Sequence, residues 1–283
     1  MIVTAPAKIN LALHITDQRA DGYHMLESLV VFAKVGDRLT IESASEDRLS
    51  FSGPFGGLLQ ADKTTNLVLK ARDAVRGVGH SVGMACPPVS IHLEKNLPLS
   101  SGIGGGSADA AAVLKALNEL WALGLKDGEL DTLGLTLGAD VPMCLYSKPL
   151  IASGIGEVIA PVHGLPDLAL VLVNPGAGVS TPQIFRALAN KSNPSLPPVS
   201  VHAAENSSAF IDYLKSTRND LQTPAVTLYP PIAGVLNTLT ASGALFARMS
   251  GSGATCFGIF ETEQAARMAA SEIAENHKNW WVS

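Results

Sequence analysis

The stretch "LPLSSGIGGGSADAAAVLKAL", residues 97–117, places four glycines within five positions directly before an alanine-rich apolar run. The apolar residues after the glycines recur at the three-four spacing of one helix face, namely Ala110, Val113, Leu114, Leu117, Leu120 and Trp121. Because glycine is a poor helix former, helix formation does not explain why four glycines stand at this position.

Two common glycine-rich phosphate motifs do not fit this stretch. A Walker-type loop requires a lysine and a Ser or Thr directly after its last glycine, but Gly106 is followed by "SADAAA" and the next lysine is Lys115. The dinucleotide fingerprint requires G-x-G-x-x-G after the first strand of a βαβ unit, and the spacing and position here do not meet that requirement.

The physical basis shared by those motifs still applies. Glycine lets the backbone approach an oligophosphate, and a helix that begins near Ser107 directs its N-terminal amides and positive dipole end toward the anion. The glycines are equally compatible with a flexible turn that is capped by Ser107. The stretch alone therefore leaves two alternatives, a phosphate cradle and a flexible turn.

The residues before the loop are rich in β-type alternation. Short strands are predicted at 8–15, 26–35 and 37–43, with a turn at "DGYH", residues 21–24. After a polar, glycine-rich passage at 50–65, Leu67, Ala71 and Val75 stand four apart and predict a helix within 66–78. Alternation in "VSIHLEKNLP" then predicts a strand that leads into the glycine-rich loop.

The rest of the chain mixes strands and helices. Residues 129–147 read as a helix running into a turn and a strand, and 154–162 as β-like sequence, with a domain boundary near residue 160. Residues 168–176 predict a strand, 188–209 a surface loop, 244–260 two strands around a glycine turn, and 261–276 an amphipathic helix.

Composition limits the class of protein. The chain has 283 residues, of which 47% are hydrophobic and 16% charged, which is typical of a folded globule. A net charge of −5 argues against nucleic acid as a partner, and the lack of a long apolar run or a basic leader favours a cytoplasmic protein with no membrane contact. Three scattered cysteines, Cys86, Cys144 and Cys256, are expected to be buried thiols.

Three separated motifs resemble those of the GHMP kinases. "PAKINLAL" at 6–13 resembles the first family motif, "LPLSSGIGGGSADAAA" the phosphate loop, and "RMSGSGATCFGIF" at 248–260 the third, glycine-rich motif. Their order and spacing match over nearly the whole chain. The resemblance implies a two-domain α+β fold, with a strand-rich N-terminal domain at 1–160 and a smaller C-terminal α/β sandwich at 161–283.

Within the family, "RADGYHMLESLVVF" and "LGADVP" look most like the branch that phosphorylates the 2-hydroxyl of 4-diphosphocytidyl-2-C-methyl-D-erythritol in the non-mevalonate isoprenoid route. The alternatives are another small-molecule kinase of the family, of homoserine or mevalonate type, and a non-catalytic protein that senses a nucleotide or sugar. The sequence does not determine the oligomeric state.

Phosphoryl transfer requires positioning, charge neutralisation and a group that takes the hydroxyl proton. From the sequence alone, Asp140 in "GADVP" is either a functional acid or a cap on local amides, and the family's general base lies in this motif. Lys8 is the natural partner, because a cation favours the ionised carboxylate and polarises a hydroxyl, although a lone lysine in a strand is ordinarily solvated.

The resemblance also implies ATP and Mg²⁺ as cofactors and places the ATP site at three groups of residues. These are the loop from Leu99, Ser100, Ser101, Gly102, Ile103, Gly104, Gly105 and Gly106 to Ser107, the third motif with Gly251, Ser252 and Gly253, and an adenine pocket with Asn66 and Lys95. Gly251–Gly253 are also compatible with a mere hairpin turn, and Asn66 and Lys95 with solvated residues at element ends.

Ser107 is the candidate Mg²⁺ contact, and Ala108 stands where the family often has a second serine. The substrate is expected to contact Asn10, Tyr23, His24, Thr181 and Phe185. The two aromatic rings would stack on the cytosine and the histidine would engage its edge. Alternatively, His24 is a plain surface residue of a turn and Thr181 a helix-start residue.

Overall fold

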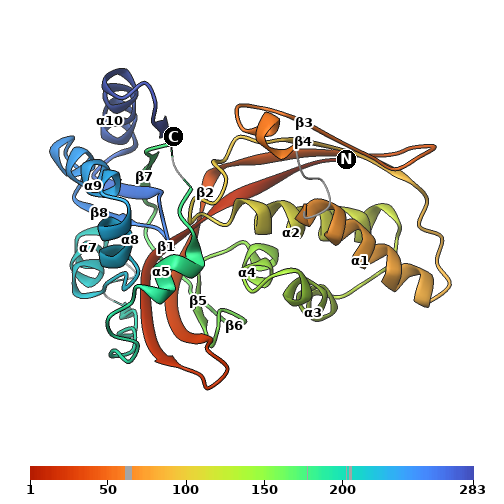
Figure 1. Cartoon of the computed structure of the whole chain (residues 1–283), viewed down its shortest axis with the longest axis horizontal. Coiled ribbons are helices and arrows are strands. Elements are labelled where there is room, and N and C mark those ends of the chain that lie inside the picture. Colours follow the sequence, from red (N-terminus) through yellow and green to blue (C-terminus); the bar gives the residue numbers. More distant parts are fainter. Residues whose placement is uncertain (61–65, 177, 202, 204–205) are drawn as a thin grey trace. The chain divides into compact units, whose positions relative to one another are not determined.

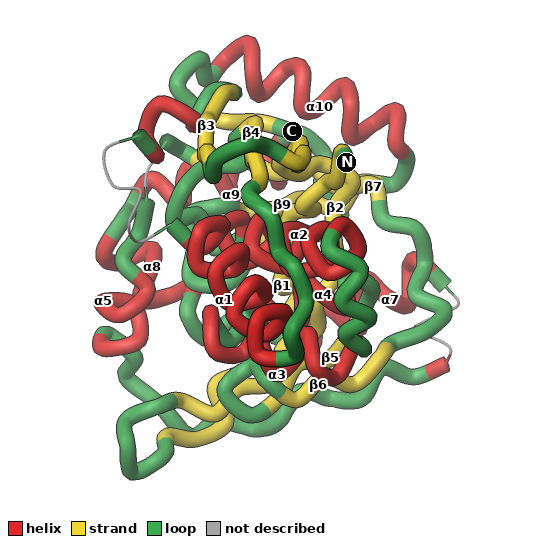
Figure 2. Tube along the Cα trace, turned by 90° about the vertical axis from the view of Figure 1, so that its right-hand side faces the viewer, coloured by secondary structure: helices red, strands yellow, loops and turns green. Residues whose placement is uncertain are grey.

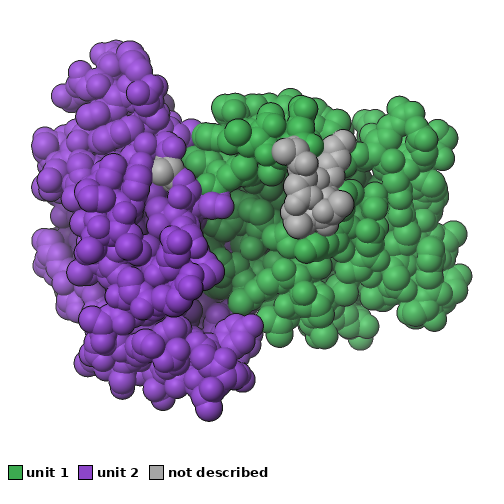
Figure 3. Space-filling view, viewed as in Figure 1, with its two compact units in different colours: residues 1–8, 33–99, 104–147 green, residues 9–32, 100–103, 148–283 purple. Residues whose placement is uncertain are grey.

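The structure is a computed structural model that describes residues 1–60, 66–176, 178–201, 203 and 206–283. The chain forms two compact units, each built from several segments (Figure 3). Unit 1 comprises residues 1–8, 33–99 and 104–147, and unit 2 comprises residues 9–32, 100–103 and 148–283. The domain boundary near residue 160 stays a prediction.

Two long strands, β1 (Ile2–Gln18) and β2 (His24–Ser43), pair with each other and contribute residues to both units (Figure 1). The turn between them contains Gly22 with φ +92°, as the sequence "DGYH" predicts. The prediction of separate strands at 26–35 and 37–43 is wrong, because β2 is continuous. Gly36 lies inside it, where a Cβ would come within 2.3 Å of the Ala5 carbonyl oxygen, so this glycine allows close packing and does not mark a turn.

Unit 1 combines strands with a group of helices. Strand β4 (Val89–Glu94) is antiparallel to β2 and parallel to β3 (Arg48–Ser52), with a 3₁₀ turn, η1, at Gly56–Leu59. Helices α1 (Leu67–Ser81), α2 (Gly105–Leu120), α3 (Asp127–Leu137) and α4 (Val141–Tyr146) pack on one another (Figures 1 and 2). Of the polar passage at 50–65, residues 61–65 lie outside the described residues.

The helix predictions around residues 67, 110 and 130 are confirmed, and so is the strand that precedes the loop. The strand expected at the end of 129–147 is wrong, because α4 occupies this segment. Pro142 lies in the first turn of α4, where its fixed φ suits a helix start. Six apolar residues are too few for their spacing to distinguish a helix from a buried strand.

Unit 2 contains two groups of strands. Strands β5 (Leu150–Ser153) and β6 (Val158–Pro161) extend the pairing of β2, and a separate sheet has the order β10-β7-β9-β8. The bounds of its strands are Ala169–Asn174 for β7, Phe246–Met249 for β8, Cys256–Phe260 for β9 and Trp281–Val282 for β10. Mixed sheets with many helices confirm the predicted α+β class.

Helices α9 (Pro231–Ala241) and α10 (Glu263–Asn276) pack on this second sheet, and unit 2 also contains α5 (Thr181–Arg186), α7 (Ser207–Ser216) and α8 (Gln222–Leu228). The loop predicted at 188–209 is too long, because Val201 and Ala203 are helical and α7 begins at Ser207; residues 202 and 204–205 are outside the described part. The loop also contributes Leu196 to the buried residues, which composition alone does not reveal.

The three cysteines are free and buried, as predicted. In the portion that the structure describes, no helix combines the length and apolar character needed to cross a membrane.

Candidate active site

An ion pair joins the two residues expected to carry the chemistry. Lys8, on β1, has its Nζ 3.0 Å from Oδ2 of Asp140, which directly precedes α4. Lys8 is buried and is therefore not a solvated edge residue. Within the described residues, the Asp140 side chain caps no amide of α4, so the capping alternative is wrong. A half-exposed carboxylate held by a buried ammonium can accept a proton from a bound hydroxyl.

The helix after the glycines begins earlier than predicted. Gly104 is its N-cap, in the left-handed conformation with φ +65°, and Gly105 is its first residue. Ser107 is the third residue of α2 and does not cap it, so the helix begins two residues before Ser107 and the Ser107-capped turn is wrong. The first intrahelical bond runs from the Ala108 amide to the Gly104 carbonyl, so the preceding amides at the helix N-terminus have no intrahelical partner, which is the arrangement that favours an anion.

The side chain of Lys8 also leaves little room for a side chain at Gly104. A Cβ at Gly104 would lie 3.1 Å from Cε of Lys8, so the loop backbone passes directly beside the lysine of the ion pair. Gly106 is exposed and Ser107 half-buried, which leaves this turn of α2 accessible. Unit 1 thus brings together Lys8, Asp140 and the helix N-terminus that the resemblance assigns to phosphate binding.

Lys95 is not a solvated residue, whereas Asn66 is half-buried at the start of α1. The Lys95 ammonium is buried and lies 2.5 Å from both Asp37 Oδ2 and Asp109 Oδ2. Burial lowers the pKa of Lys95, but Asp109 and Asp37 outweigh burial and raise it, whereas burial raises the pKa of Asp109 to about 7. Asn66 is the N-cap of α1, where its side chain accepts a hydrogen bond from the Val68 amide.

In unit 2, the third motif packs on the middle of the glycine-rich loop. The buried Ser250 hydroxyl accepts a hydrogen bond from the Asn10 amide and donates one to the Gly102 carbonyl, both at 3.0 Å. The Thr255 amide donates to the Ser101 carbonyl, and a Cβ on Gly102 (φ +75°) would lie 2.4 Å from the Ser250 carbonyl oxygen. Residues 251–253 therefore turn between β8 and β9 and also pack against the loop. The side chain of Ile103 is in the core, Leu99 is half-buried and Ser100 is exposed.

The residues expected to contact the substrate fall into two groups in unit 2. Tyr23 is 60% exposed, and the His24 and Phe185 rings lie 4.9 Å apart. His24 Nε2 is buried without a hydrogen-bond partner among the described residues, so His24 is not a plain surface residue. Asn10 is buried and donates to Ser28, whereas Thr181 hydrogen-bonds Ser252 of the third motif at 2.7 Å.

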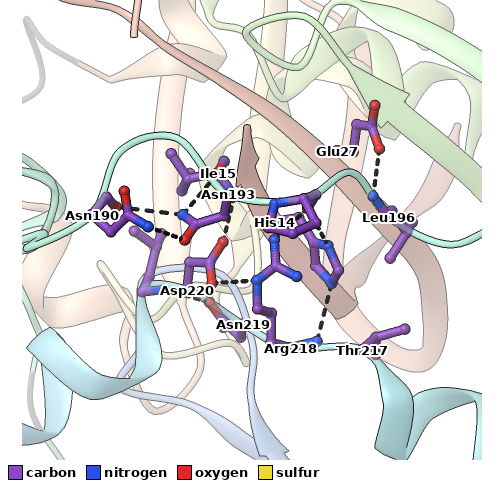
Figure 4. Close-up of polar contacts among 12 residues, drawn as sticks. His14, Ile15, Glu27, Asn190, Asn193, Leu196, Thr217, Arg218, Asn219 and Asp220 are labelled. Atoms are coloured by element: carbon purple, nitrogen blue, oxygen red, sulfur yellow. Dashed lines mark hydrogen bonds and ion pairs between the residues drawn. The ribbon is translucent and has the colours of Figure 1, made fainter. Parts of the chain in front are cut away.

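Sequence reasoning missed a polar network that supports this side of unit 2 (Figure 4). Asn219 donates from Nδ2 to the carbonyls of Met249 and Gly251, and these two hydrogen bonds fix the backbone of the third motif. The Ile15 amide donates to Asp220, which also accepts from Arg218 Nε, and the Arg218 amide donates to Nε2 of the buried His14. No sequence signal identifies these residues, because their partners are distant in the chain.

Comparisons with known proteins identify the family. The model described as "GHMP kinases N terminal domain" matches residues 66–148, and the one described as "GHMP kinases C terminal" matches residues 201–279. The 4-diphosphocytidyl-2-C-methyl-D-erythritol kinase of Agrobacterium fabrum (strain C58 / ATCC 33970) is 53% identical over 99% of this chain and 94% of its own length. The protein of the same name from Rhizobium etli (strain CIAT 652) is 56% identical over 98% of this chain and 92% of its own length.

Solved structures extend the comparison. A crystal structure of 4-(cytidine 5'-diphospho)-2C-methyl-D-erythritol kinase has a TM-score of 0.79 and 34% identity, and the match covers 100% of this chain and 98% of that chain. A homoserine kinase from Cytophaga hutchinsonii, with a TM-score of 0.70 and 18% identity over 100% of this chain and 94% of that chain, shares the fold.

Proposed function

The chain belongs to the GHMP kinase family, and from this premise we propose that it transfers the γ-phosphoryl group of ATP to the 2-hydroxyl of 4-diphosphocytidyl-2-C-methyl-D-erythritol. This reaction supplies the non-mevalonate route to isoprenoids. The proposal is supported by the names of relatives that match almost the full length of the chain and by the "RADGYHMLESLVVF" segment. The observation that carries it is the Lys8–Asp140 pair.

Asp140 is the proposed general base. Its carboxylate accepts the proton of the substrate 2-hydroxyl as the oxygen attacks the γ-phosphorus, and the bond from that phosphorus to the leaving ADP oxygen breaks. Lys8 orients the carboxylate and polarises the hydroxyl. Because the lysine is buried and its neighbour Gly104 passes beside its side chain, the ammonium has little freedom to leave this position.

The family is ATP-dependent, and we propose that the loop from Leu99 to Ser107 and the third motif at 251–253 bind the ATP phosphates, with Asn66 and Lys95 supporting the nucleotide site. Mg²⁺ supplies charge neutralisation on the phosphate oxygens, and Ser107 is the residue proposed to contact it. No group of three or more His, Cys, Asp or Glu suited to a metal occurs among the described residues. The half-buried Ser107 hydroxyl would supply an oxygen ligand of the kind that Mg²⁺ prefers.

The cytidine end of the substrate is assigned to Tyr23, His24 and Phe185. The His24 Nε2 atom that lacks a partner in the described part of unit 2 is a free position for a hydrogen bond to the base edge. Asn10 and Thr181 are proposed to contact the methylerythritol and diphosphate parts. Residues 1–160 and 161–283 are the proposed N- and C-terminal domains, and the cytoplasmic location stays a prediction.

The test measures ADP release from ATP and Mg²⁺ with the diphosphocytidyl alcohol, mevalonate, homoserine or no acceptor. Release that depends on the diphosphocytidyl alcohol supports the proposal. Release with mevalonate or homoserine alone would assign the chain to another branch of the family. ATP binding without turnover on any acceptor would instead support the sensor alternative.

A further inference from the structure

Three charged side chains are buried together in unit 1. Lys95, just after β4, lies 2.5 Å from Asp37 of β2 and 2.5 Å from Asp109 of α2. Their side chains are 2%, 0% and 4% exposed. Burying three charges costs free energy, and two carboxylates share one ammonium, so this cluster is not explained as a simple source of stability.

The cluster connects the two ends of the glycine-rich loop. Asp37 Oδ1 accepts hydrogen bonds from the amides of Asn96 and Leu97, at 2.6 and 2.8 Å, in the segment that leads into the loop. Asp109 lies in the second turn of α2, which follows the loop. Lys95 therefore joins the start of the loop to α2, the helix that begins where the loop ends.

Gly105, the first residue of α2, lies directly over the ammonium. A Cβ at this position would be 3.2 Å from Lys95 Nζ and 3.6 Å from Asp37 Oδ2. The cluster thus packs against the first turn of α2, which is the turn proposed to approach phosphate.

The Lys95 side chain is not accessible to a ligand. Its side chain is 2% exposed, and two of its three N–H groups are engaged in charge-assisted hydrogen bonds to carboxylates. Asp109 Oδ1 is buried with no hydrogen-bond partner in the described part of the chain, and Oδ2 accepts the hydrogen bond from Lys95.

We infer that Lys95 is a positioning residue, whose ammonium, held by Asp37 and Asp109, fixes the N-terminus of α2 against the start of the loop and thereby shapes the phosphate site without contacting the adenine base. The inference rests on the proposed function, because it assumes that the loop binds phosphate. It changes the expected role of Lys95 from lining the adenine pocket to ordering the triphosphate cradle.

The test compares Asp109→Leu with Asp109→Asn in the full chain, because both leave the neutral Lys95–Asp37 pair in place and only the asparagine keeps an oxygen acceptor for Lys95. The ligands are ATP, inorganic tripolyphosphate and adenosine. Asp109→Leu is expected to weaken ATP and tripolyphosphate equally, by about tenfold, as loss of a charge-assisted hydrogen bond implies. Adenosine affinity should not change, and Asp109→Asn should restore both affinities to within about threefold.

Lys115→Met is the matched control on the same helix. Lys115 donates to the Leu145 carbonyl on α4, so its loss should lower the thermal unfolding temperature without changing the Kd of tripolyphosphate. A selective loss of adenosine affinity in Asp109→Leu would overturn the inference, and so would unchanged affinities in folded protein. If the wild-type chain bound neither ATP nor tripolyphosphate, the proposed function itself would fail.

Discussion

Lys8 Nζ lies 3.0 Å from Asp140 Oδ2, and the two side chains differ in exposure, at 5% and 41%. The ammonium is therefore fixed by its surroundings, whereas the carboxylate can be reached by a substrate. This asymmetry suits a general base whose orientation is set from within the protein.

Asp140→Asn is expected to keep the fold and ATP affinity but to lower kcat by roughly 10²- to 10⁴-fold, because the amide cannot take the hydroxyl proton. Steady-state kinetics and the ATP Kd measure the two effects. Asp127→Asn, an acidic residue in the first turn of α3, is the control and should retain turnover. Near-normal kcat in folded Asp140→Asn would remove this carboxylate from the mechanism.

Two glycines of the loop should respond differently to alanine. Gly102 has φ +75° and its Cβ would meet backbone atoms at 2.4 and 2.6 Å, so Gly102→Ala should lower the free energy of unfolding by about 2 kcal/mol or more. Gly106 is helical, and among the described residues its Cβ would meet only Leu67 Cδ1, at 3.6 Å. Gly106→Ala should therefore fold normally and raise the KM for ATP, because the methyl group lies where phosphate approaches.

Urea unfolding and ATP kinetics on both variants distinguish these outcomes. Equal stability of the Gly102 and Gly106 variants would contradict the packing of the third motif on the loop. A normal KM for ATP in Gly106→Ala would favour phosphate binding away from this turn.

The sequence predicts those elements whose period is long enough to read, such as α2 and α10, and those motifs whose residues are close together. It does not predict α4, because six apolar residues carry no clear period, nor the continuity of β2, because Gly36 resembles a turn signal until its contact with Ala5 is seen. The Lys8–Asp140 pair is suggested by two motifs more than a hundred residues apart, but its geometry comes from the fold.

The sequence does not predict which polar residues of the site act together when their partners are distant in the chain. Asp37 and Asp109 are ordinary acids in the sequence, and only their burial against Lys95 shows that they act together. Asn219 is likewise unremarkable until the fold brings it to the third motif. Burial of such groups depends on packing between elements and leaves no local pattern.

Tyr23→Ala and Phe185→Ala should weaken binding of the cytidyl substrate by roughly ten- to a hundredfold, as loss of a base-stacking surface implies, and leave ATP affinity unchanged. Because Tyr23 is 60% exposed, its removal should change stability by less than about 0.5 kcal/mol. The KM for the cytidyl substrate measures the effect, and the uridyl analogue is the specificity control. An unchanged KM in both variants would place the cytidine elsewhere.

His14 should make stability depend on pH. Its ring is fully buried, and Nε2 accepts a hydrogen bond from the Arg218 amide, so the hydrogen is on Nδ1, which faces the Pro194 carbonyl (Figure 4). Burial first, and then the Arg218 guanidinium, lower the pKa of His14 below its usual value of 6.5, although Asp220 acts in the opposite direction. The unfolded chain therefore takes up a proton here before the folded chain does.

We expect the free energy of unfolding to be highest above pH 6.5 and to fall as the pH decreases below it, by at most about 1.4 kcal/mol per pH unit for this one group. Urea titrations at pH 7.5 and 5.5 measure the decrease, which should be smaller in His14→Gln because glutamine does not titrate. His24 should affect stability in the same direction, because burial and then Lys191 lower its pKa. His24→Gln is therefore the comparison variant, and it should remove a separate part of the decrease in the free energy of unfolding. Parallel pH dependence in wild type and His14→Gln would show that the ring is protonated equally in the folded and unfolded chain.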